Sequence, residues 1–104
     1  MAIAEFTVVP IGTSSTSLSS YVAAMHRVLE EEQAKGTVTF HLSAMSTIVE
    51  GPLEHLMNVV LRVHEVPFEM GAGRVSTSVK IDDRRDKPGA SVEQKLQSVY
   101  SKLK

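Results

Sequence analysis

Residues 37–52, TVTFHLSAMSTIVEGP, decide the fold that we predict from this sequence. They are typical of two short strands with a break near Ser46, and Gly51-Pro52 ends the second strand. Side chains alternate across a strand, so the first strand has an apolar and a polar face. The apolar face carries Val38, Phe40, Leu42 and Ala44, and the polar face carries Thr39, His41, Ser43 and Met45. A half-polar sheet face requires water, a partner sheet or a ligand.

The flanking sequence predicts further strands from alternation and helices from apolar residues at helical spacing. The first predicted elements are a strand at residues 2–9 before Pro10 and a helix that Ser17 caps and that ends near Lys35-Gly36. The two strands of residues 37–52 follow, and then a helix that begins at Pro52 and stops before Pro67. The last predicted elements are a strand at residues 74–82, a charged turn over DDRRDKPG and a helix that Ser91 caps. The apolar stripe of this last helix comprises Val92, Leu96, Val99, Tyr100 and Leu103.

This order, β-α-β-β-α-β plus a C-terminal helix, predicts a ferredoxin-like α+β sandwich that forms a single domain over residues 1–104. Both crossover helices then cover one face of the sheet. The opposite face collects mainly polar residues: Thr7, Thr39, His41, Ser43, Met45, Ser76, Ser78 and Lys80.

Composition restricts the class of function. The chain has 104 residues, 42% hydrophobic content and a net charge of −1, which is typical of a globular domain and argues against nucleic acid as the main partner. It has no cysteine, which excludes disulfides, thiolate metal sites and a cysteine nucleophile. We expect no signal peptide, no membrane-spanning segment and a cytoplasmic location.

The sequence gives little support for catalysis. The histidines form no i, i+4 ligand pair, so we expect no metal site. No serine lies in a G-x-S-x-G setting, and Gly71-x-Gly73 lacks the strand and helix of a phosphate loop. His64, on an apolar stripe beside Glu65, is predicted to be partly buried and hydrogen-bonded. We therefore expect no catalytic residue.

Ligand binding has better support near the strand break. Ser43 and Thr47 bring hydroxyls that donate and accept hydrogen bonds, and Glu50 brings a carboxylate. Met45 can pack against a flat ring, and His41 shares the polar face. Two alternatives stay open: Glu50 caps the helix that begins near Pro52, and His41 lies in a sheet-to-sheet interface.

Several segments resemble one family in order and spacing. They are VVPIGTSSTSLSSYVA, STIVEGPLEHLMNVVLRVHE, RVSTSVKIDDRRDK and EQKLQSVYSKL, which together cover nearly the whole chain. On these segments the chain resembles the small thiamine-binding proteins of the YkoF-like superfamily, formerly a conserved family of unknown function. One departure is Ser46, where the family often has glycine, and it affects the loop beside the expected pocket.

The resemblance implies a ferredoxin-like subunit that assembles into dimers or tetramers. It also implies binding of thiamine or its hydroxymethylpyrimidine part, without catalysis and without a further cofactor. The contacts it implies are Ser43, Thr47 and Glu50, with His41 and Met45 beside them. The alternative is a structural or regulatory homo-oligomer with no small-molecule ligand, whose polar sheet face is a wet interface. The run Arg84-Arg85-Asp86 is either an interface contact or a solvated turn.

Overall fold

The computed structural model of the chain describes residues 1–86 and 91–103. In chain order these residues form β1 (Ala2–Ile11), α1 (Ser19–Ala34), β2 (Thr39–Leu42), β3 (Thr47–Gly51), α2 (Leu53–Glu69), β4 (Arg74–Asp83) and α3 (Val92–Lys102). The strands pair antiparallel in the order β2-β3-β1-β4. This is the predicted α+β sandwich with an added C-terminal helix. Residues 87–90 of the expected charged turn lie outside the described residues.

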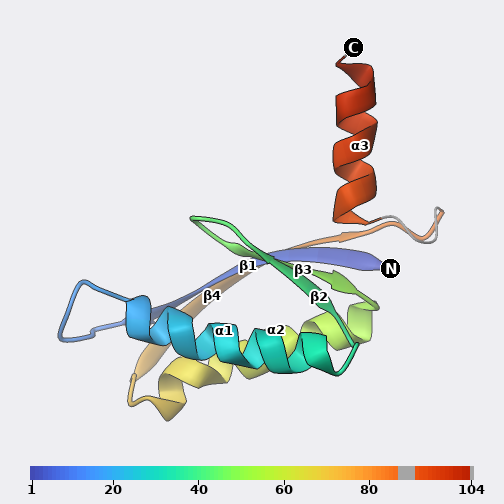
Figure 1. The fold of residues 1–104 in the computed structure, drawn as a ribbon. Coiled ribbons are helices and arrows are strands. Elements are labelled where there is room, and N and C mark those ends of the chain that lie inside the picture. The colour runs from blue at the N-terminus through green and yellow to red at the C-terminus, as the bar shows by residue number, and fades with distance from the viewer. Residues whose placement is uncertain (87–90, 104) are drawn as a thin grey trace.

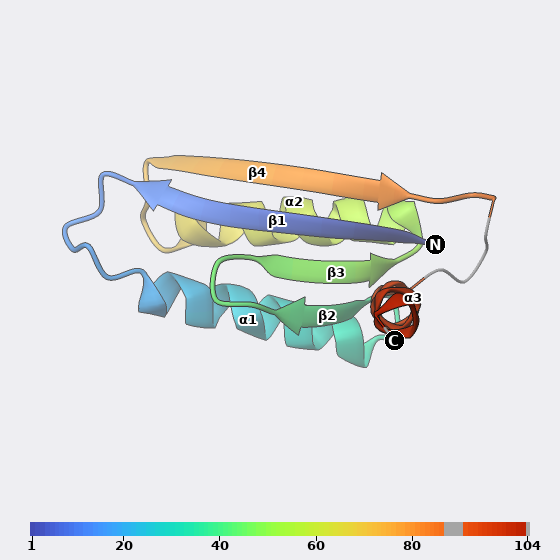
Figure 2. The ribbon, with the colours of Figure 1, turned by 90° about the horizontal axis from the view of Figure 1, so that it is seen from above.

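Helices α1 and α2 lie side by side on one face of the sheet, and α3 projects from the opposite side (Figures 1 and 2). The hydrophobic core fills the space between the sheet and the helix pair. Its buried members are Ala2, Ala4, Phe6, Met25, Leu29, Val38, Val49, Leu56, Val59, Val60, Val63 and Val66. Val49 and Leu56 are fully buried, which places the centre of the core between β3 and α2.

Within the strands, the faces follow the predicted alternation. The placement of Ser43 and Met45 on the polar face is wrong, because β2 ends at Leu42 and both residues lie in the turn that follows it. Ala4 pairs with Val49 on one side and Ile81 on the other, and these three residues share the face that the helices cover. Glu5 pairs with Ile48 and Lys80, which share the opposite face. We call this second face the open face. Its residues from β1 to β4 are Ile3, Glu5, Thr7, Val9, Ile11, Thr39, His41, Ile48, Glu50, Arg74, Ser76, Ser78, Lys80 and Asp82.

Two predicted boundaries at prolines are wrong. β1 continues through Pro10, which pairs with Val75 of β4. Since β3 pairs with β1 only as far as Phe6, Pro10 lies where one side of β1 has no strand partner, and proline is tolerated there. α2 likewise continues past Pro67 to Glu69, because the proline lies in the last turn and its ring is buried.

The predicted caps differ in outcome. Ser91 caps α3 as expected, because its hydroxyl accepts a hydrogen bond from the Gln94 amide at 3.1 Å. Ser17 does not cap α1, whose N-cap position is Leu18 without a side-chain bond. The Ser17 hydroxyl lies 3.2 Å from that of Ser19 instead, so serines of the loop hydrogen-bond each other and leave the helix end uncapped.

An ion cluster joins α1 to α2 on the outer surface of the helix layer. Arg62 of α2 donates to Glu31 and, at 2.7 Å, to Glu32 of α1. The hydrogen bond from Arg62 lowers the pKa of the Glu32 carboxyl below its ordinary value; Lys35 adds to this effect, and partial burial opposes it. The folded state therefore favours ionised Glu32.

We predict that Arg62→Gln lowers the free energy of unfolding at pH 7 by about 0.5–1 kcal/mol, because solvent reaches the Arg62 side chain and screens its pairs with Glu31 and Glu32. Since the pKa of Glu32 in the folded protein lies below its ordinary value of 4.5, this contribution is complete above about pH 4.5 and is lost as the pH falls through the folded value. Urea unfolding at pH 7 and pH 3 measures it, with Arg27→Gln as control. An equal deficit at both pH values would contradict the assignment.

Candidate functional site

A cavity of about 440 Å³ lies between the β2–β3 hairpin, β1 and the N-terminal half of α1. We call it the hairpin pocket. Its apolar walls are formed by Phe6, Val8, Val9, Leu18, Val22, Met25, Leu29, Leu42, Ala44 and Met45, and its polar residues are Thr7, His26, Ser43, Ser46 and Thr47. A concave, mainly apolar site with a few polar groups is the usual form of a small-molecule site, and this volume falls in the usual range.

Ser43 forms the tight turn at the edge of the hairpin pocket. Its hydroxyl donates to the carbonyl oxygen of Ser46 at 3.0 Å and accepts from the Ser46 amide at 3.2 Å. The Ser46 hydroxyl in turn donates to the Glu5 carboxylate at 3.1 Å. The side chain of Ser43 therefore shapes the rim, and its hydroxyl is already engaged within the chain.

Thr47 differs from Ser43 both in its position and in the state of its hydroxyl. It pairs with Phe6 on one side and Leu42 on the other, so its half-buried side chain lies on the helix side of the sheet. Its hydroxyl has no hydrogen-bond partner among residues 1–86 and 91–103. A hydroxyl in this state can both donate to and accept from a bound molecule.

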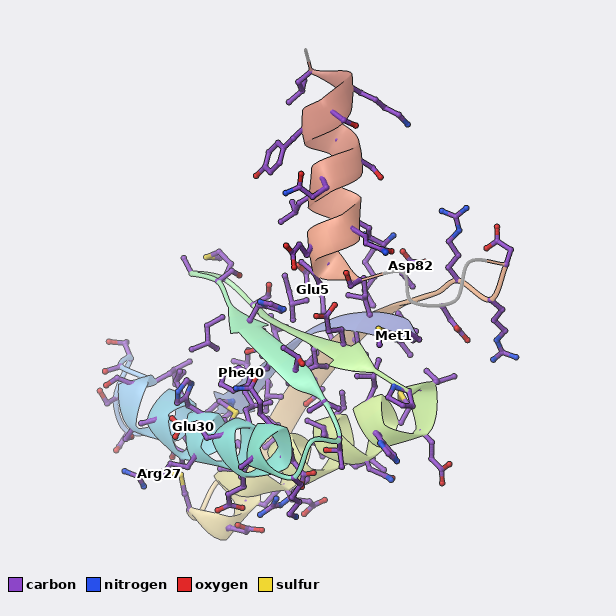
Figure 3. The ribbon with its side chains drawn as sticks, turned by 45° about the vertical axis from the view of Figure 1, so that its right-hand side comes forward. Met1, Glu5, Arg27, Glu30, Phe40 and Asp82 are labelled. Carbon is purple, nitrogen blue, oxygen red and sulfur yellow. The ribbon has the colours of Figure 1, made fainter. Side chains whose placement is uncertain are left out.

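His26 of α1 also lines the hairpin pocket. Its Nε2 lies 2.7 Å from the Glu30 carboxylate, and its ring packs edge-on against Phe40 at 5.2 Å. Glu30 lies on α1, and Phe40 lies on the strand above it (Figure 3). The Nδ1 atom is buried and has no hydrogen-bond partner among the described residues. When Nε2–H donates to Glu30, the neutral ring leaves Nδ1 as an acceptor.

The other predicted contacts divide between two places. Met45 lies at the tip of the hairpin and is 86% exposed, so its thioether is free to fold over the pocket mouth. His41 and Glu50 lie on the open face, where His41 Nε2 is 3.5 Å from Glu50 Oε1. The structure thus brings Ser43, Met45 and Thr47 together and separates them from the other two.

Glu50 does cap a helix, although the helix is α3. Its Oε2 accepts a hydrogen bond from the Val92 amide at 2.8 Å. The alternative that Glu50 caps the helix beginning near Pro52 is wrong, because the N-cap of α2 is Pro52 without a side-chain bond. The carboxylate is therefore engaged by His41 and by the start of α3, and it does not line the hairpin pocket.

His64 and the arginine run have structural contacts. The prediction of a partly buried, bonded His64 is confirmed, because its Nδ1 lies 2.6 Å from the Thr77 hydroxyl. Arg84 pairs with Asp86, and this contact raises the pKa of the guanidinium above its ordinary value. Arg85 pairs with Asp83. In the described part of the chain, the run therefore forms local ion pairs on an exposed turn.

His26 is the pocket residue that sequence reasoning missed. The sequence shows it only as a helical histidine with no second metal ligand. The available signal was Glu30, four residues later on the same helix face, because such a partner fixes one ring nitrogen and leaves the other for a different contact. The meeting of α1 with the hairpin depends on the tertiary fold, and no local pattern gives it.

The fold places the chain among ferredoxin-like α+β domains. A family model described as thiamine-binding protein matches residues 4–100. The UPF0045 protein YqgV of Bacillus subtilis is 46% identical over 99% of this chain and 98% of its own length. A UPF0045 protein of Methanothermobacter thermautotrophicus is 44% identical over 99% of this chain and all of its own. The chain belongs to the thiamine-binding protein family.

Solved structures share the fold of this chain. A hypothetical protein of Methanocaldococcus jannaschii superposes with a TM-score of 0.82 at 28% identity, over 95% of each chain. A Thermotoga maritima protein, whose name assigns it provisionally to thiamine biosynthesis or salvage, superposes with a TM-score of 0.68 at 21% identity, over 94% of this chain and 97% of its own. The second likeness shows the fold alone.

We predict that His26→Phe leaves the stability of the ligand-free protein unchanged within about 1 kcal/mol. The substitution keeps the aromatic contact and removes an unpaired buried nitrogen, which offsets the loss of the exposed pair with Glu30. The matched variant His64→Phe breaks the bond to Thr77 and should cost about 1–2 kcal/mol. Thermal unfolding at pH 7 compares them. A larger loss for His26→Phe than for His64→Phe would contradict the assignment of an unpaired Nδ1.

Proposed function

We propose that this protein binds thiamine or its hydroxymethylpyrimidine part in the hairpin pocket, as a homo-oligomer, without catalysing a reaction and without a cofactor. The observation that carries the proposal is the uncommitted hydroxyl of Thr47 in an apolar cavity that the side chain of His26 also lines. Membership of the thiamine-binding protein family supports the choice of ligand.

The chemistry of an aminopyrimidine suits these groups. Its flat ring is apolar on both faces, and the walls of the hairpin pocket provide aliphatic surface from Val22, Met25 and Leu42. Its amino group donates hydrogen bonds and its ring nitrogens accept them, and the Thr47 hydroxyl can accept from the amino group or donate to a ring nitrogen.

The partners of three histidines support a binding role over an enzymatic one. His26, His41 and His64 contact Glu30, Glu50 and Thr77 respectively. None of these contacts places a histidine between an acid and a serine, the arrangement that activates a nucleophile. Among the described residues no helix is long and apolar enough to cross a membrane. A cytoplasmic location remains part of the proposal.

A second candidate function is a structural or regulatory homo-oligomer with no small-molecule ligand. The observation that favours it is the open face, where Val9 and Ile11 are each 41% exposed beside polar neighbours. An exposed sheet face of this kind is suited to contact with another subunit. Ligand titration separates the two candidates, because only the first requires saturable binding.

We predict that thiamine and free hydroxymethylpyrimidine each bind saturably in calorimetric titration of the wild-type protein. Thr47→Val should weaken both affinities about tenfold, because the ring loses a hydrogen bond while the pocket keeps its volume. The matched control is Thr39→Val, the same change on the open face of β2, and it should leave both affinities unaltered. Absence of binding by the wild-type protein at millimolar ligand would overturn the proposed function.

A further inference from the structure

The hairpin pocket has no permanently charged side chain in its lining. Charged residues make up 22% of the chain, yet the described residues that line this pocket include no aspartate, glutamate, lysine or arginine. His26 is the one residue of the described lining that titrates near neutral pH, and its ring is either neutral or positive. The lining therefore offers no negative group to a cation and no permanent positive group to a phosphate.

Two carboxylates contact polar residues of the lining from outside the pocket. Glu30 lies 2.7 Å from His26 Nε2, and its side chain is 61% exposed. Glu5 accepts a hydrogen bond from the Ser46 hydroxyl at 3.1 Å and lies on the open face, near the base of α3 (Figure 3). Each carboxylate thus already has a partner, and neither of them lines the pocket.

The inner wall of the hairpin pocket is apolar and buried. Phe6, Met25 and Leu29 are only 3%, 8% and 2% exposed. The hydroxyls of Ser43 and Ser46 lie at the rim and are engaged within the chain. A neutral polar ring needs only a few hydrogen bonds in such a site, whereas an ion that enters loses its hydration and gains no counter-charge. The pocket therefore penalises a charged ligand more than a polar one.

We infer that the hairpin pocket selects uncharged aromatic heterocycles and discriminates against charged forms of the same ligand. The inference rests on the proposed function and names the class of ligand within it. Hydroxymethylpyrimidine is uncharged at pH 8, whereas thiamine carries a fixed positive charge on its thiazolium ring, and its diphosphate ester adds negative charge. The pocket thus suits the free pyrimidine better than thiamine, and it gains nothing from the diphosphate.

The first test changes the charge of the ligand and keeps its shape. Deazathiamine has the same aminopyrimidine as thiamine, and a neutral thiophene replaces the thiazolium ring. We expect calorimetric titration of the wild-type protein at pH 8 to give at least about fivefold tighter binding of deazathiamine than of thiamine, because only thiamine brings an unpaired charge. A smaller difference, or tighter binding of thiamine, would overturn the inference.

The second test changes the charge of the protein, because deazathiamine is also more apolar than thiamine. Met45 lies at the pocket mouth and is 86% exposed, so Met45→Glu and Met45→Gln should both fold. The two variants have side chains of one shape and differ in charge. At low ionic strength we expect Met45→Glu to bind thiamine at least about threefold more tightly than Met45→Gln does, and the two variants to bind deazathiamine equally. Equal thiamine affinities in the two variants would contradict the inference.

The third test uses thiamine diphosphate as a probe of positive groups. A site that binds a diphosphate usually provides lysine, arginine or a helix N-terminus directed at it. The described lining has no lysine or arginine, so we expect the wild-type protein to bind thiamine diphosphate no more tightly than thiamine. Tighter binding of the diphosphate would overturn the inference.

These titrations also distinguish the inference from the proposed function. Saturable binding of thiamine at higher affinity than deazathiamine would contradict the inference and leave the proposed function intact. Absence of binding by thiamine, deazathiamine and free hydroxymethylpyrimidine at millimolar concentration would overturn both.

Discussion

The alternation of side chains along β1 is the constraint on which the rest of the structure depends. β1 is hydrogen-bonded to β3 on one side and to β4 on the other, so its residues can only point above or below the sheet. Ala2, Ala4 and Phe6 point toward the helices and are buried. A one-residue shift in the register of β1 would move all three side chains to the open face, and the core would lose the apolar side chains that β1 contributes to it. Since α1 and α2 are the only crossover helices in the described chain and cover a single face, the other face remains for contacts outside the chain.

The same alternation in β3 places Thr47 and Glu50 on different surfaces of the protein. Thr47 and Glu50 are three residues apart, and an odd separation places them on opposite faces of the strand. Thr47 therefore joins the hairpin pocket, whereas Glu50 joins the open face and binds the first turn of α3. One strand thus supports a proposed ligand site on the helix side and a proposed assembly surface on the other. Most substitutions on one surface should leave the other surface unaltered, because few side chains belong to both.

The sequence predicts the order of elements, both strand faces and the cap at Ser91, because each depends on local spacing or on one hydrogen bond within a turn. The helix ends were less predictable: Pro67 lies inside α2, since burial of its ring is a tertiary effect. The lining of the hairpin pocket was predicted in part. Met45 and Thr47 were recognised as residues near the strand break, but alternation should have separated Glu50 from them. His26 was missed because its place in the pocket depends on how α1 packs under the hairpin.

The measurement that tests the account most directly is a map of amide chemical-shift changes across the protein during titration with thiamine. We expect the largest changes on residues 43–47 and on the turn of α1 around His26, because these segments enclose the hairpin pocket. Amides near Glu50 and Val92 should change little. Changes concentrated at Glu50, Val92 and the open face, with residues 43–47 unaffected, would contradict the central claim that the ligand lies on the helix side of the sheet.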